Sequence, residues 1–348
     1  MAYTAIDDAG ANYSTTLYTG TGSSNAITGV GFAPNLVWLK GLLGDTDFQQ
    51  FWFDPVRGAT EYIRSNVSNA EATDANSLTS FDSDGFTLGT TYGVNASTKN
   101  FVTWDWKAGT TTGIDTTGSS ITPSSYSFNQ DAGFSIIAYT GDGATSALIP
   151  HGLGAVPAMI AVKGLTTAQD WAIYHHKMDA TAPEDYYIKF NTNGVRGSAT
   201  DRWNDTAPTS VLFTVGSDIG VNDAYNYIAY CWAPKQGYSK FGGYEGNANA
   251  NGTVVYTGFR PAFIMTKSID STSDWQIFDS KRDGFNVDNY ELVANDNQAQ
   301  STTDRIDILS NGFKCRTAGD PNYGETYIYM AFAESPFVNS NGAPTNAR

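Results

Sequence analysis

The sequence has few of the residues that build metal centres and disulfide frameworks. Its 348 residues include two cysteines and three histidines, without the spacing of a metal-binding motif. Cys231 and Cys315 occupy different positions of the repeat described below, so we expect two free thiols in strands. A single disulfide is the alternative. The sequence therefore predicts no cofactor and no metal site.

Charge is also scarce and mostly of one sign. Only 16% of the residues are charged, and the formal net charge is −15. Such a surface repels a phosphate backbone, and no run of Lys and Arg offers a local exception. No apolar run is long enough to cross a bilayer, and residues 1–10 lack the basic and apolar regions of a signal peptide. We expect neither a nucleic-acid partner nor a membrane partner.

The sequence is rich in residues that form short strands and turns. It contains 35 Gly and 12 Pro, which mark turns, together with 19 Phe, 20 Tyr and 8 Trp, which favour strands. Strand signals recur every eight to twelve residues with no helical period. This composition predicts an all-β protein built from antiparallel sandwiches.

Three segments of the chain repeat one another. Each begins with a Tyr-x-Gly opening, continues to a proline that starts a buried strand, and has a lysine six residues after that proline. The openings start at Tyr18, Tyr139 and Tyr244, the prolines are Pro34, Pro157 and Pro261, and the lysines are Lys40, Lys163 and Lys267. We therefore expect three diverged copies of one module.

Each copy closes with an aromatic strand. Residues 101–107 align with residues 227–233 and residues 327–333. Alternation along a strand places Val102, Trp104 and Trp106 on one face. The equivalent residues of the other two copies are Ile228, Tyr230 and Trp232, and Ile328, Met330 and Phe332. The pattern predicts that this face is the core of each module.

These landmarks divide the chain into three tandem antiparallel β-sandwich modules, which we expect to be jelly-roll-like. Module one covers residues 1–107, a Ser/Thr/Gly-rich linker covers 108–132, and a diverged module two covers 133–234. Module three covers 235–337, and 338–348 form a polar tail that we expect to be poorly ordered. Because the second junction is shorter, modules two and three should pack more closely than modules one and two.

Modules one and three share an Asp-x-x-Arg pair that module two lacks. The pairs are Asp54 with Arg57 and Asp279 with Arg282, and we interpret each as a clamp that holds a loop to the sheet, with a ligand site as the alternative. The turn at Asp82-Ser-Asp84-Gly85 resembles the start of a calcium loop. It lacks the later ligands, so we interpret it as a hairpin turn.

No motif of an enzyme occurs in the sequence, so we expect no catalytic residues. His175 and His176 lie near Asp170 and Asp179, but adjacent strand residues point to opposite faces. We therefore expect this histidine pair at an exposed strand end or loop. His151 should be a turn residue that hydrogen-bonds to backbone.

Aromatic residues in the most polar part of module two are candidates for binding a glycan. Trp203 lies in Asp201-Arg-Trp-Asn-Asp205, and Tyr186 and Tyr187 lie nearby in the sequence. Exposed rings of this kind could stack on a sugar, or they could pack against a neighbouring subunit or module. We favour packing.

The motifs of the chain resemble a repeat family from structural proteins of tailed phages, especially marine ones. Besides the motifs quoted above, the resemblance is carried by Ile27 to Pro34, Leu78 to Thr87, Gly133-Phe-Ser-Ile, His151-Gly-Leu-Gly and Gly237 to Gly242. The resemblance begins at Met1-Ala-Tyr-Thr-Ala-Ile-Asp-Asp8 and covers most of the chain. It implies a virion component, either a tail fibre or appendage or a capsid decoration protein, and no established chemistry.

The resemblance also implies the partners and the location. We expect a protein that is made in the host bacterial cytoplasm, assembled on the phage particle, and bound to other virion proteins and to itself, with a trimer favoured. The alternative is a module that recognises a host-surface glycan. A glycan-degrading enzyme ranks third, because no motif supports it.

Overall fold

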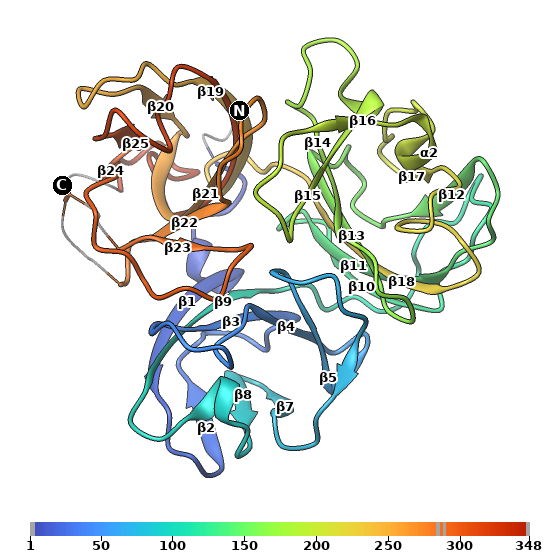
Figure 1. The fold of residues 1–348 in the computed structure, drawn as a ribbon, viewed down its shortest axis with the longest axis horizontal. Helices are drawn as coiled ribbons and strands as arrows, with labels where there is room; N and C mark the ends of the chain where they lie inside the picture. The colour runs from blue at the N-terminus through green and yellow to red at the C-terminus, as the bar shows by residue number, and fades with distance from the viewer. Residues whose placement is uncertain (1–3, 283–285, 288–289, 346–348) are drawn as a thin grey trace.

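The computed structural model describes residues 4–282, 286–287 and 290–345. Within this part, 42% of the chain is strand and 4% is helix, and the sheets are antiparallel. The predicted all-β sandwich architecture is therefore confirmed. The modules form three lobes around a common centre (Figure 1).

Module one consists of a large sheet and a small sheet. The large sheet has the order β1-β9-β3-β4-β5-β6, and the small one has the order β2-β8-β7. The large-sheet strands are β1 (Tyr13–Thr19), β9 (Asn100–Trp106), β3 (Leu36–Gly41), β4 (Phe51–Asp54), β5 (Gly58–Arg64) and β6 (Ala72–Thr73). The small sheet contains β2 (Asn25–Thr28), β8 (Gly85–Leu88) and β7 (Leu78–Asp82), and the short helices are η1 (Ala9–Ala11) and α1 (Tyr92–Asn95).

Module two has the same two sheets, with one difference in each. Its order is β10-β11-β18-β13-β14-β15-β16, so an extra strand, β10, lies outside β11, and only β12 and β17 form the small sheet. The large-sheet strands are β10 (Ser125–Asn129), β11 (Phe134–Thr140), β18 (Asn226–Trp232), β13 (Met159–Gly164), β14 (Ala172–His175), β15 (Tyr186–Lys189) and β16 (Gly197–Ser198). The remaining elements are β12 (Ala147–Pro150), β17 (Leu212–Val215), η2 (Pro183–Asp185) and α2 (Thr200–Trp203).

Module three has the order β19-β26-β21-β22-β23 in its large sheet and β20-β25-β24 in its small sheet. The large-sheet strands are β19 (Ser239–Glu245), β26 (Thr326–Pro336), β21 (Phe259–Ser268), β22 (Gln276–Asp279) and β23 (Leu292–Val293). The small-sheet strands are β20 (Val254–Tyr256), β25 (Gly312–Cys315) and β24 (Ile306–Leu309). Cys231 and Cys315 are free, buried and in strands, as the sequence predicts.

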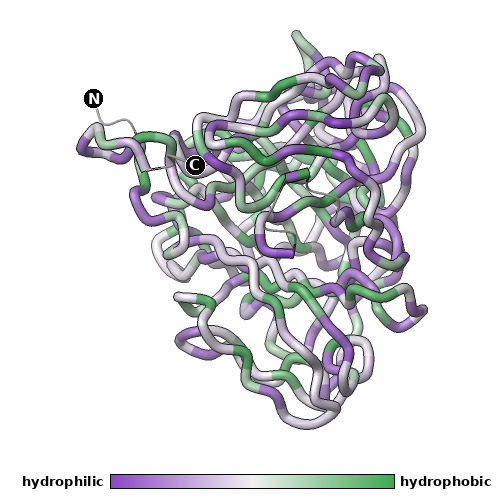
Figure 2. Tube along the Cα trace, turned by 90° about the vertical axis from the view of Figure 1, so that its left-hand side faces the viewer, coloured by the Kyte–Doolittle hydropathy of each residue, from purple (hydrophilic) through white to green (hydrophobic). Residues whose placement is uncertain are grey.

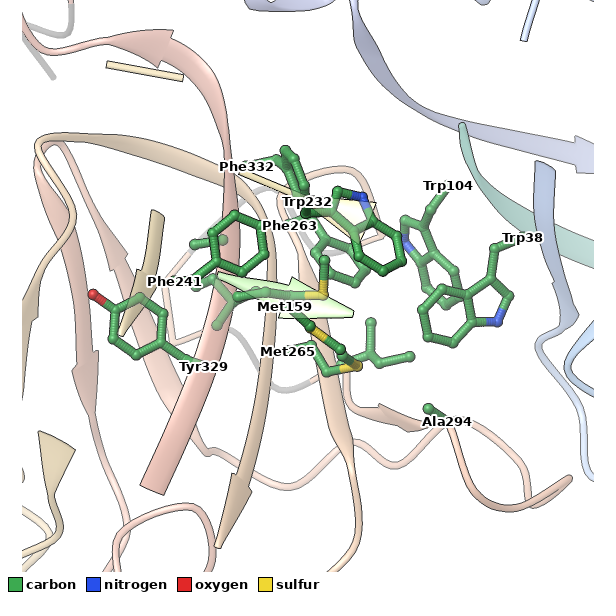
Figure 3. Close-up of a cluster of buried hydrophobic side chains, with 14 of the residues drawn as sticks. Trp38, Trp104, Met159, Trp232, Phe241, Phe263, Met265, Ala294, Tyr329 and Phe332 are labelled. Carbon is green, nitrogen blue, oxygen red and sulfur yellow. The ribbon is translucent and has the colours of Figure 1, made fainter. Parts of the chain in front are cut away.

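The tryptophan-bearing faces of the large sheets meet at the centre of the molecule. All eight tryptophans are buried, and seven of them belong to one cluster that draws on all three modules. Trp38 and Trp104 of module one, Trp232 of module two, and Phe263 of module three lie together there (Figure 3). Ring contacts such as Trp52–Trp171, with centroids 5.1 Å apart, cross the module boundaries.

The other face of each large sheet packs against the small sheet of the same module. In module one, Val37 and Phe53 join Phe86 of β8 in a separate cluster. In module two, Ile160 and Cys231 join Phe213 of β17. The alternation along the closing strands is therefore as predicted, but the face that carries Trp104 and Trp106 is not the core of one module. It packs between modules, because a sheet with both faces covered buries both sets of alternating residues.

The predicted linker and tail are partly built into the sheets. Residues 108–132 contain β10, and Thr110 forms a bridge with Phe128 in that strand. Residues 338–345 fold back in a turn closed by the bridge between Val338 and Pro344. The Ser340 hydroxyl then hydrogen-bonds to Asp7, so the two ends of the described chain meet. Figure 2 shows both ends on the same side of the molecule.

Candidate functional site

The Asp-x-x-Arg pairs form the predicted clamps. The Arg57 side chain donates to Asp54 through Nε at 2.6 Å and to the Trp52 carbonyl at 2.9 Å, and its backbone N–H also donates to Asp54. Arg282 makes the same contacts with Asp279 and the Ile277 carbonyl, again at 2.6 Å for the ion pair. Burial disfavours the charged guanidinium of Arg57, but the charges of Asp54, Tyr230 and Glu71 raise its pKa, so the guanidinium stays charged.

Each clamp also binds the neighbouring module. The Tyr230 hydroxyl of module two donates to Oδ2 of Asp54 at 2.7 Å. The Trp104 indole of module one donates to Oδ2 of Asp279 in module three at 3.0 Å. Tyr230 and Trp104 occupy the same position of their closing strands, so the two interfaces use equivalent residues.

Module two lacks the Asp-x-x-Arg clamp, and a different contact replaces it at the boundary with module three. His175 ends β14 at the position that Asp54 occupies in β4. In module three the counterpart of Tyr230 is Met330, whose side chain has no hydrogen-bond donor. His175 instead hydrogen-bonds through Nε2 to the Tyr329 carbonyl at 3.2 Å, while Nδ1 accepts from the Lys177 amide. Burial lowers the pKa of His175 to about 3, so the ring is neutral. Met178, which is buried, takes the place of the clamp arginine.

The three lysines of the repeat lie in the same boundaries. Each is buried, and its Nζ donates to one or two carbonyls of its own hairpin and to one carbonyl of the adjacent module. The partner carbonyls in the adjacent module belong to Asn297 for Lys40, Ser68 for Lys163 and Asn193 for Lys267, at 3.2, 3.1 and 3.4 Å. Burial lowers the pKa of Lys40 to about 7 and those of Lys163 and Lys267 to about 8.

Two further layers of hydrogen bonds repeat around the centre. The residue before β4, β14 or β22 donates to the carbonyl of the last residue of a strand in the neighbouring module. That strand is β23, β5 or β15, respectively. The three pairs are Gln50 with Val293, Trp171 with Arg64, and Trp275 with Lys189. In the second layer, backbone amides donate to backbone carbonyls of the neighbouring module. The pairs are Glu71 with Leu165, Arg196 with Ile269, and Gln300 with Leu42. The lysine contacts and these two layers therefore repeat in one direction at all three interfaces, and the modules form a closed pseudo-threefold ring.

A buried asparagine that the repeat motifs above do not include holds the Tyr-x-Gly opening of every module. Asn95, Asn222 and Asn322 are buried, and each side chain accepts from an amide of the opening loop and donates to its carbonyls or side chains. A signal was present, because each asparagine stands five or six residues before its closing aromatic strand.

The three predicted glycan-binding residues lie around helix α2 and do not form an exposed aromatic platform. Trp203 is 2% exposed and packs edge-on against Tyr174 in the core of module two. Its ring therefore has no face available for a sugar, and it packs inside module two rather than against a neighbouring subunit. Tyr186 and Tyr187 are partly buried, and their rings are covered by Arg196 and Arg202 at 4.7 and 4.6 Å.

The remaining candidates have structural partners. His175 is buried and His176 is half-buried against the Phe241 carbonyl, so the expectation of an exposed histidine pair is wrong. His151 hydrogen-bonds to the Thr209 carbonyl, as expected. Asp84 lies in the β7–β8 turn and accepts from the amides of Gly29 and Gly31.

Within residues 4–282, 286–287 and 290–345, no three His, Cys, Asp or Glu side chains are grouped as a metal site. No helix in the same ranges has the length and apolar character to span a membrane. The fold and its centre define an all-β protein of three sandwich modules locked into a ring. The chain belongs to the family described as Domain of unknown function (DUF7483), whose model matches residues 8–336. No curated protein and no solved structure matches the chain.

Proposed function

We propose that the protein is a structural component of a tailed-phage virion, a tail fibre or appendage or a capsid decoration protein. In this role it acts as a rigid multi-module scaffold and docking surface. The observation that carries the proposal is the closed ring, in which every module is bonded to both of its neighbours through side chains and backbone. A body held in this way resists relative movement of its modules, which suits a particle component better than a hinged enzyme.

The low charge and the family-like motifs of the sequence support the same role. Some strands are paired on one side only, such as β20 of module three, and other virion proteins could add contacts along such edges. Self-association, with a trimer favoured, belongs to the proposal and would use such edges. A host-glycan reader built on Trp203 has lost its main support, because that ring is buried.

Mass spectrometry of purified particles tests this function. Particles from the phage that encodes the chain would be purified by density gradient, and its peptides would be quantified against a known major capsid protein. We expect a fixed copy number per particle and a defined position by electron cryomicroscopy. Peptides confined to the soluble lysate, with none in purified particles, would contradict the proposal.

A further inference from the structure

A polar cavity of about 280 Å³ opens beside β22 and β23 of module three. Its lining includes Gln276, Glu291, Arg305, Asp320 and Tyr323. The side chain of Gln276 is 3% exposed and its amide hydrogen-bonds to Glu291, yet its Oε1 has no hydrogen-bond partner. A buried acceptor without a partner is costly to a fold, so this atom points to a ligand that donates a hydrogen bond.

The charged residues of the cavity are fixed in place by other parts of module three. Arg305 donates to Glu291 through Nε at 2.9 Å and to the Asp320 carbonyl at 2.9 Å. The Tyr327 hydroxyl donates to Oδ1 of Asp320 at 3.0 Å. Burial raises the pKa of Asp320 to about 6, so its carboxylate is mostly ionised at neutral pH. The site therefore combines fixed acceptors with one guanidinium donor group.

The equivalent places in the other modules are built differently. The pair Gln276 and Glu291 corresponds to Phe51 and Tyr62 of module one, whose rings are in edge-to-face contact at 5.2 Å. In module two the corresponding tyrosine is Tyr187, and Arg202 of helix α2 lies over its ring. Module one also has a cavity of about 280 Å³ at this place, but the Phe51 and Tyr62 rings line it. A lining of several carboxylates and a guanidinium is therefore particular to module three, and the sheet does not require it.

From these observations we infer that module three has a binding site for one neutral sugar residue. The hydroxyl groups of a sugar donate and accept together, which matches a buried amide oxygen, carboxylates and a guanidinium in one cavity. Tyr323 is 48% exposed at the rim and offers a ring face on which the apolar side of a pyranose can stack. The volume is near the lower end of the range for small-molecule pockets, which suits one monosaccharide unit.

The chemistry of the cavity excludes other classes of ligand. A phosphate or a uronic acid would meet Asp274, Glu291 and Asp320 against the single charge of Arg305. A metal ion would lack a set of ligands, because no three His, Cys, Asp or Glu side chains are grouped to hold one within the described residues. A neutral polyol meets neither obstacle. This inference does not depend on whether the chain is part of a virion.

Saturation-transfer NMR of the full chain with single sugars tests the site. The panel would contain neutral hexoses and N-acetylhexosamines, glucuronic acid, and methylammonium as a cationic probe. We expect transfer to at least one neutral sugar and none to glucuronic acid or methylammonium. Tyr323→Ala and Gln276→Leu should each weaken that binding about tenfold, which is the loss expected when one good polar or stacking contact is removed.

Tyr256→Ala is the matched control, because Tyr256 is an exposed tyrosine of the same module outside this cavity. Its binding should equal that of the unchanged chain. Gln276→Leu should keep or raise the melting temperature, since it removes an unpartnered buried acceptor. Binding that Tyr323→Ala leaves unchanged, transfer to methylammonium alone, or no transfer to any sugar would overturn the inference.

Discussion

The indole nitrogen of Trp104 in module one lies 3.0 Å from the carboxylate of Asp279 in module three, although 175 residues separate them. Its counterpart at the next boundary is the 2.7 Å bond from Tyr230 to Asp54. The first bond joins the first module to the last one and so closes the ring, and the second joins modules one and two. Each bond ends on a carboxylate that is already paired with an arginine.

Tyr230→Phe removes one of these bonds without changing the packing of the ring. We expect the free energy of unfolding to fall by about 1.5–3 kcal/mol, the usual value for a hydrogen bond to a charged group. The control is Tyr139→Phe, whose hydroxyl binds the neutral Val221 carbonyl inside module two at 2.7 Å. Denaturant unfolding measures both. A loss no larger than that of the control would contradict a special role for the boundary.

His175→Asp should be strongly destabilising, although modules one and three carry aspartate at this position. The new carboxylate would face the Tyr329 carbonyl, with Met178 where the clamp arginine stands elsewhere. We expect a loss of about 3–5 kcal/mol, as for a buried charge left without its partner. Adding Met178→Arg should restore part of the loss. A single variant as stable as the unchanged chain would contradict this account.

Asp105→Asn should stabilise the protein, and more so at higher pH. Asp105 is fully buried, and burial raises its pKa to about 8, so the folded state holds a proton that the unfolded state releases above about pH 4. Stability is therefore lost as the pH rises from about 4 to 8. We expect the free energy of unfolding of the variant to exceed that of the unchanged chain by about 1–3 kcal/mol between pH 5 and pH 8.

Asp105→Ala gives a second variant for the same measurement, because module three has Ala331 at this position. Unfolding curves recorded at several pH values compare all three proteins. If the gain over the unchanged chain did not grow with pH, the carboxyl would not be protonated in the folded state.

Lys163→Met should flatten the stability profile at alkaline pH. Burial lowers the pKa of Lys163 to about 8, so between pH 8 and its unfolded value near 10.4 the unfolded state binds more protons. The stability of the unchanged chain therefore rises with pH in this window. We expect the variant to lose up to about 3 kcal/mol of that rise. An identical slope in both proteins would show that the ammonium is not desolvated.

Cutting the chain between modules one and two should leave the ring intact. Gly113 is exposed, and a Cβ built on it would meet nothing within 4 Å, so a protease recognition sequence can be inserted beside it. After cleavage we expect the two fragments to stay together in gel filtration and to unfold in a single transition. Separation of a fragment containing module one would show that the linker, rather than the interfaces, holds this module in place.

Much of the fold follows from local patterns that the sequence carries. Alternation at Trp104 and Trp106 fixes the register of a closing strand, and Pro157 marks the start of a buried one. The same patterns do not say what lies opposite a face. For this reason alternation alone predicts that the Trp104 face is the core of one module, whereas Trp104 packs against Phe263 of another module. Contacts between modules depend on long-range assembly, which strand periodicity does not encode.

The residues of the site were predicted where they repeat and were missed where they vary. Asp54 and Arg57 were found as a clamp because Asp279 and Arg282 repeat them. The polar neighbours of Trp203 leave both an exposed ring and a packed ring open, and the short helix α2 turns the ring inward. Gln276 gave no signal at all, since a single glutamine in a strand has no distinguishing neighbours.

A ring made from one chain behaves differently on dilution from a ring made from three. Three separate subunits dissociate when their concentration falls below the dissociation constant of the ring. Covalently joined modules instead meet at an effective concentration that is set by the connections between them. The centre of this molecule is therefore assembled as soon as the chain has folded, at any copy number. Each boundary can also carry its own residues, as His175 and Met330 do, without the change appearing at the other two.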